Sequence, residues 1–190
     1  MAEYTLQAEP PLAGAEMEIA GVRLWAPADL ALVSLALPLG GEDAALMAIR
    51  AAYGAGLPEI GRSVVADDGT RLVRLSADLA FALFTHATPD AEHVVADRLN
   101  GAVYTTDQTD VWVALALSGP NTRRALERIC PIDLHRQVFA VDHAARTVME
   151  HLGVLILRTG EDDYLLLSAS SSAKSFLHAV EVSLTNVNQT

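Results

Sequence analysis

A long apolar run that occurs twice is the feature that most constrains the fold of this chain. Residues 30–37 read Leu-Ala-Leu-Val-Ser-Leu-Ala-Leu, and residues 111–117 read Val-Trp-Val-Ala-Leu-Ala-Leu. A bilayer span takes about 20 apolar residues, so each run suits a strand covered on both faces instead. Each run leads through a Gly- and Pro-containing turn into a helical pattern. The sequence therefore predicts a repeated strand–helix unit.

The elements after each run follow a similar order. They predict one α+β domain over residues 1–190, built from duplicated strand–helix–strand–strand–helix units with helices packed on mixed or antiparallel sheets. The pseudo-repeat halves are 22–101 and 102–184, after an extended N-terminal arm at 1–20. The expected helices are 42–53, 89–99, 121–129 and 173–184, and further strands are expected at 22–25, 71–75, 79–84, 146–151, 154–158 and 164–167.

Charge and cysteine content limit the function classes. With 24 acidic and 13 basic side chains, the formal net charge is −11, which disfavours binding to phosphate backbones. The N-terminus is acidic and lacks the basic and apolar regions of a signal peptide. Cys130 is the single cysteine, which suits a reducing compartment. We expect a soluble cytoplasmic protein that binds neither nucleic acid nor membrane.

No pattern in the sequence makes a persuasive active site. The glycines match neither a dinucleotide fingerprint nor a phosphate loop, and the histidines lack metal-ligand spacing. Cys130 is predicted to be a buried, inert thiol. Asp107 and Asp110 are the best candidates for paired catalytic carboxylates, but a solvated turn ahead of a buried strand is the favoured interpretation. The prediction is no catalytic, cofactor-binding or metal-binding residue in this chain.

Several ordered segments carry a family resemblance. They are 11–14, 33–40, 107–113, 117–120, 129–135 and 145–147, with His151 and the strand pair up to Leu167 beyond them. In order and spacing they resemble the gamma subunit of heterotetrameric sarcosine oxidase, most specifically from Asp107 to His151. The family's middle segment usually carries a Trp–Gly–Pro–Asp–Trp type strand. The matching residues 74–81 keep Asp78 and neither tryptophan, which marks a divergent member.

The resemblance implies a fold and a function. The fold would be that of the folate-binding domain of aminomethyltransferases, in agreement with the duplicated pattern. The complex would oxidatively demethylate sarcosine or a related N-methyl amino acid, with tetrahydrofolate as co-substrate. FAD, FMN, NAD and zinc would belong to partner subunits, named alpha, beta and delta. This chain would hold no cofactor, would not be catalytic in isolation and would brace the large subunits. Its expected contact residues are Pro11, Leu12, Arg123 and Arg128.

Two other functions remain open at this point. One is a free-standing folate-binding or aminomethyltransferase-like protein, which requires a folate-sized cleft with Asp107 or Asp110 pointing into it. The other is a free-standing homo-oligomeric binding domain, which requires a self-complementary apolar patch. Arg123, Arg124 and Arg128 share the outer face of one predicted helix. This face is either simply exposed to solvent or docks an acidic partner.

Overall fold

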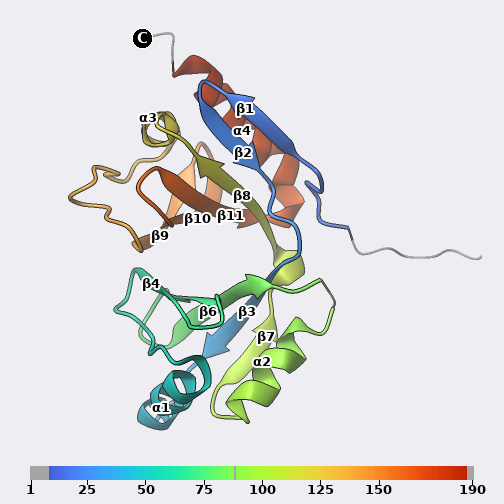
Figure 1. Ribbon diagram of the computed structural model, residues 1–190, viewed down its shortest axis with the longest axis vertical. Coiled ribbons are helices and arrows are strands. Elements are labelled where there is room, and N and C mark those ends of the chain that lie inside the picture. The colour runs from blue at the N-terminus through green and yellow to red at the C-terminus, as the bar shows by residue number, and fades with distance from the viewer. Residues whose placement is uncertain (1–8, 88, 188–190) are drawn as a thin grey trace, which may run out of the picture.

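The computed structural model describes residues 9–87 and 89–187, which form two antiparallel sheets and four helices (Figure 1). The sheets face each other across a shared apolar layer, and each has a pair of helices on its other side. The order of layers is therefore helices, sheet, sheet, helices. The predicted α+β class is confirmed.

The first sheet has five strands in the order β4-β5-β6-β3-β7, and helices α1 and α2 cover its outer face. All of its pairs are antiparallel. The bounds of its elements are β3 Leu30–Ala36, α1 Glu42–Tyr53, β4 Arg62–Val65, β5 Arg71–Arg74, β6 Leu79–Thr85, α2 Ala91–Leu99 and β7 Tyr104–Asp107.

The second sheet has six strands in the order β1-β2-β8-β11-β10-β9, also antiparallel, and helices α3 and α4 cover its outer face. The bounds are β1 Glu16–Ile19, β2 Val22–Trp25, β8 Trp112–Ser118, α3 Thr122–Ile129, β9 Ala144–Met149, β10 Leu152–Arg158, β11 Asp163–Ala169 and α4 Ala173–Asn186. Short 3-10 turns, η1 Thr109–Val111 and η2 Ser170–Ser172, precede β8 and α4.

The apolar runs are buried on both faces, as predicted. In β3, Val33 and Leu35 pack under α1 and α2, while Leu32 packs between the sheets. In β8, Leu115 packs under the helices of the second sheet, and the partly buried Ala114 packs between the sheets. A fully buried aliphatic side chain contributes roughly 1.5–3 kcal/mol. The inter-sheet core consists of Leu32, Val73, Phe81, Leu83, Ala144, Leu155, Leu157 and Leu167.

The two halves exchange their first strands. β2 precedes β3 in the chain but pairs with β8 of the second sheet, where Leu24 lies opposite Leu117. β7 precedes β8 in the chain but pairs with β3 of the first sheet, where Thr105 lies opposite Leu35. Each half therefore supplies a strand that completes the sheet of the other half.

Short polar strands account for the differences from the prediction. β1, β4 and β7 were not expected, so each unit is strand–helix–three strands–helix, with one more strand than predicted in the first half. The expected extended arm at 1–20 is wrong for Glu16–Ile19, because this segment is β1 and pairs with β2. Residues 1–8 of that arm lie outside the described residues.

The edges of the two sheets meet where β4 approaches the segment before β9. The amide of Ser63 donates to the Asp142 carbonyl at 2.7 Å, and the amide of Ala144 donates to the Gly61 carbonyl at 2.8 Å. Arg71 Nη1 donates to Asp142 Oδ1 at 2.7 Å. Backbone and ion-pair contacts thus join the edges, in addition to the apolar layer between the sheets.

Arg158, at the end of β10, organises the segment that leads to this junction. Its side chain is 3% exposed. The guanidinium donates to the carbonyls of Phe139 at 2.7 Å, Gly160 at 3.3 Å and Glu161 at 2.5 Å. A buried charge requires such compensation. Arg158 therefore fixes both the loop before β9 and the β10–β11 turn.

His143 lies between this arginine and the sheet edge. Its ring packs against Phe139 at a centroid distance of 5.5 Å. Burial lowers the pKa of His143, and the nearby cations Arg62 and Arg158 lower it further. The folded protein therefore disfavours the imidazolium form.

The strand exchange predicts that the halves cannot fold separately. A fragment of residues 1–101 keeps β2 without its neighbour β8 and leaves β3 with an open edge, whereas 102–190 lacks β1 and β2. Since unpaired apolar strands are unstable and associate, each fragment alone should lack a cooperative thermal transition. Circular dichroism and amide NMR of each fragment and of their mixture check this, with the full chain as control. A fragment that melts cooperatively as a monomer would contradict the shared-sheet account.

The lowered pKa of His143 predicts a pH-dependent stability. The unfolded chain binds a proton near the ordinary value of 6.5, and the folded chain binds it only at lower pH, so stability falls as the pH drops below about 6.5. In His143→Gln, the free energy of urea unfolding should fall less between about pH 7 and about pH 5.5, a window above most carboxylate titrations. Equal decreases in both proteins would show that His143 is not responsible.

Candidate functional site

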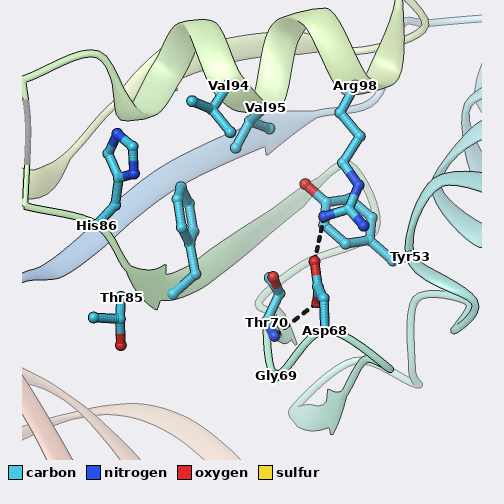
Figure 2. Close-up of a pocket in the computed structure, with 10 residues that line it drawn as sticks. Tyr53, Asp68, Gly69, Thr70, Thr85, His86, Val94, Val95 and Arg98 are labelled. Atoms are coloured by element: carbon cyan, nitrogen blue, oxygen red, sulfur yellow. Dashed lines mark hydrogen bonds and ion pairs between the residues drawn. The ribbon is translucent and has the colours of Figure 1, made fainter.

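A first hollow on the described surface lies between α2, the end of β6 and the β4–β5 turn, with a volume of about 330 Å³ (Figure 2). Arg98 reaches across it from α2. The guanidinium carbon lies 4.2 Å from the centroid of the Tyr53 ring, and Nε donates to the Ala52 carbonyl at 3.0 Å. Nη1 forms an ion pair with Asp68. Arg98 thus connects α2 to the end of α1 and to the turn.

Electrostatics support a structural role for this cluster. Burial acts to raise the pKa of Asp68, but hydrogen bonds from Arg98 and Thr70 outweigh it and leave the pKa lowered. Burial raises the pKa of Tyr53, against the opposing effect of Arg98. The carboxylate therefore neutralises the guanidinium, and this hollow offers little to an anionic ligand.

The second hollow, of about 250 Å³, lies between the N-terminal turn and η1. Asp107 and Asp110 both line it and both are exposed. Asp107 Oδ1 accepts a hydrogen bond from the amide of Thr109 at 2.8 Å, which is the turn geometry favoured by the sequence. Trp112 Nε1 is buried here without a hydrogen-bond partner among the described residues. Ligand pockets usually measure about 300–1,000 Å³, so this hollow is small for a folate.

The third hollow has a volume of about 530 Å³ and lies between the end of α3, the β9–β10 turn and α4. Arg128 stands on its rim, as does His151 from the turn. Its lining is Arg128, Ile129, Glu150, His151, Leu152, Ser175, His178, Ala179, Val182, Ser183 and Asn186.

The four predicted contact residues differ in exposure and in their partners within the chain. Pro11 is exposed, but Leu12 is 7% exposed and packs in the chain's own core, so Leu12 is not available to a partner. Arg123 forms an ion pair with Glu127 one turn along α3. Arg128 is exposed and forms no ion pair within the described part of the chain. Of the four, Arg128 therefore has the charge and exposure that docking requires.

Other chemical groups serve the chain's own structure. Cys130 is buried and free, with its sulfur 3.9 Å from Thr147 Oγ1, in agreement with the predicted buried thiol. Across residues 9–87 and 89–187, no cluster of three or more His, Cys, Asp or Glu side chains has the geometry to hold a metal ion. In the same residues, no helix combines the length and apolarity needed to cross a membrane. Arg158 is the main polar residue that sequence analysis missed.

The contacts of Arg98 predict a stability effect. Arg98→Ala removes the ion pair with Asp68, the stacking on Tyr53 and a hydrogen bond, each partly exposed, so the free energy of unfolding should fall by about 1–2 kcal/mol. Urea denaturation checks this, with Arg50→Ala on the exposed face of α1 as the matched control. An unchanged midpoint in Arg98→Ala would show that the cluster does not brace the fold.

Comparison with known proteins places this architecture in a family. No protein-family profile matches the chain. The sarcosine oxidase gamma subunit of Corynebacterium sp. strain P-1 is 31% identical over 144 residues, covering 75% of this chain and 70% of the relative. That of Arthrobacter sp. is 33% identical over 121 residues, covering 63% and 60%. This chain thus matches less than two thirds of the length of the Arthrobacter relative.

Solved structures share the fold. A chain of heterotetrameric sarcosine oxidase from Corynebacterium sp. U-96, in complex with pyrrole 2-carboxylate, aligns with a TM-score of 0.79 at 24% identity, covering 95% of this chain and 96% of that one. Glycine cleavage system aminomethyltransferase T from Bartonella henselae aligns with a TM-score of 0.65 at 16% identity, covering 85% and 46%. The fold is the one that the sequence resemblance implied. With sequence identity above 30% across 70% of the strain P-1 relative, this chain belongs to the sarcosine oxidase gamma subunit family.

Proposed function

We propose that this chain is the accessory, non-catalytic gamma subunit of a heterotetrameric sarcosine oxidase that oxidatively demethylates sarcosine or a related N-methyl amino acid. The identity to gamma subunits across 70% of the strain P-1 relative carries the proposal. The alignment with a chain of the U-96 heterotetramer, over 96% of that chain, supports it.

The geometry of the described residues agrees with an accessory role. Arg98 and Arg158, each with several partners inside the fold, brace loops and turns rather than line an open reaction site. Asp107 caps a turn. The third hollow instead combines an exposed arginine with apolar side chains, as a contact surface between proteins does.

The partners in this proposal are the alpha, beta and delta subunits. They would carry FAD, FMN, NAD and zinc, and tetrahydrofolate would accept the one-carbon unit released from the amine. The gamma chain would hold none of these groups and would contribute contact surface. The assembly would work in the cytoplasm, where a chain with one buried free thiol stays reduced.

A second candidate function rests on the second hollow. There the buried Trp112 Nε1 without a described partner lies in the same small cavity as Asp107 and Asp110. Together with the fold shared with aminomethyltransferase T, this favours a folate-binding or aminomethyltransferase-like protein as the alternative. The carboxylates would accept hydrogen bonds from a pterin-like ring, and the indole would donate one.

The accessory role predicts co-purification. A tagged copy of the chain, expressed in the native host and isolated, should bring down larger subunits that show flavin absorbance and release peroxide when sarcosine is added. Mass spectrometry identifies the subunits, and an untagged culture is the control. A colourless protein that elutes alone would contradict the proposal.

Tetrahydrofolate titration separates the two candidate functions. The lone chain should leave Trp fluorescence unchanged if it is only an accessory subunit, because Trp112 lines the hollow that a folate would enter. A saturable change in wild type that is lost in Asp107→Asn would favour the folate-binding alternative. Trp25 lies in the β1–β2 hairpin and also fluoresces. The variant Trp25→Phe removes this second indole, so that any remaining change in fluorescence comes from Trp112.

A further inference from the structure

The third hollow has the form of a preformed groove on the outer face of the second sheet's helices. At about 530 Å³ it is larger than the other two. Its apolar lining comes from the end of α3, the start of β10 and one side of α4, and Val182 is 42% exposed. The apolar lining residues are Ile129, Leu152, Ala179 and Val182.

The walls of this groove are held in place by hydrogen bonds. Ser183 Oγ, buried at 3% exposure, donates to the Ala125 carbonyl at 2.6 Å and fixes α4 against α3. The amide of Glu150 donates to the Ile129 carbonyl at 3.2 Å and ties the β9–β10 turn to the end of α3. A groove that exists before binding avoids the entropy cost of ordering its walls.

The lining of the groove holds more arginine and histidine side chains than carboxylates, although the whole chain is acidic. The lining holds a single carboxylate, Glu150, whereas Arg128 stands on the rim with His151 and His178. On α3, Arg123 pairs with Glu127, whereas Arg128 forms no ion pair within the described residues, nor does Arg124 one turn before it. In a chain with a net charge of −11, this helical face therefore keeps cations that its own carboxylates do not neutralise.

The apolar lining and the unpaired cations together indicate which kind of protein segment would bind in the groove. An exposed apolar groove favours a large aliphatic or aromatic side chain, and a neighbouring arginine favours a carboxylate placed beside that anchor. We propose that the groove formed by α3, the β9–β10 turn and α4 docks an acidic segment of a partner protein that inserts an apolar anchor next to Val182 and pairs a carboxylate with Arg128.

This inference rests on the proposed function, because the partner it requires is one of the oxidase subunits. It goes further by assigning the contact to one surface and by stating the chemistry of the segment that binds there. It also assigns the contact to Arg128 and not to Arg123, because Arg123 already forms an ion pair with Glu127.

The test uses tagged wild-type and variant chains expressed in the native host, with recovered subunits measured by quantitative mass spectrometry. Val182→Glu and Arg128→Glu should each lower the recovery of the flavin-bearing subunits by at least about tenfold. Arg128→Lys should keep most of the recovery. Matched controls carry the same changes on the helices of the first sheet: Val94→Glu, at 43% exposure, and Arg50→Glu should assemble as wild type does.

Thermal melting of each purified chain separates lost docking from lost folding. Val182 and Arg128 are exposed, so their variants should melt as wild type does. A photo-cross-linking residue at position 178, in the groove, should attach to a partner peptide in which Asp or Glu flanks a large apolar residue.

Each other outcome has a defined meaning. Wild-type recovery with both charged variants would overturn the docking surface while leaving the accessory function intact. Loss with Val182→Glu alone would overturn the acidic character of the occupant. Cross-linking to a second copy of this chain would overturn the assignment to an oxidase subunit. If wild type itself recovers no subunit, the proposed function and this inference both fail.

Discussion

The apolar layer shared by the two sheets is the constraint on which the rest of the structure depends. Strands such as β3 and β10 carry apolar side chains on both faces, so helices alone cannot cover them. The second face is buried only when the sheets stack, where Leu32 and Leu155 meet in the inter-sheet core. Exchange of β2 and β7 reinforces the stack, since each sheet then contains a strand of the other half. We therefore expect the chain to unfold as one cooperative unit.

This constraint also explains why several clusters of polar residues that resemble functional sites stabilise the fold instead. The turns and sheet edges outside the apolar layers are held in place by contacts of arginine side chains. Arg158 holds two loops through their carbonyls, Arg71 pairs with Asp142 where the sheet edges meet, and Arg98 clamps the turn under α2. Arg128, by contrast, is exposed and forms no ion pair within the described residues, and this is why we propose it as a contact residue.

Sequence reasoning reached the parts of the fold that local pattern determines. The runs at 30–37 and 111–117 predict β3 and β8, because a strand buried on both faces is apolar throughout. The helical stripes predict the helices, because burial of one face places apolar residues at helical spacing. The strands β1, β4 and β7 have four residues each and mix polar with apolar side chains, so they carry too little pattern to be recognised. The exchange of β2 and β7 depends on long-range pairing, which no local pattern encodes.

The candidate site also has features that the local sequence pattern predicts and features that it does not. Exposure of Arg128 follows from the helical stripe of α3 and was predictable, as was the turn at Asp107. Burial of Leu12 was not, because it depends on a turn, closed by the amide of Ala13 and the Pro10 carbonyl, that packs this side chain into the second sheet's core. The groove was not predictable either, since it joins residues from α3, the β9–β10 turn and α4 that are far apart in the sequence.

Hydrogen exchange of the free chain and of the assembled complex tests the central claim most directly, namely that this chain acts as a contact subunit through its α3–α4 face. The account predicts that assembly slows exchange in peptides from α3 and α4, while peptides around η1 keep their rate when sarcosine and tetrahydrofolate are added. Protection confined to the η1 region and dependent on tetrahydrofolate would contradict it, and would identify the second hollow as the functional site.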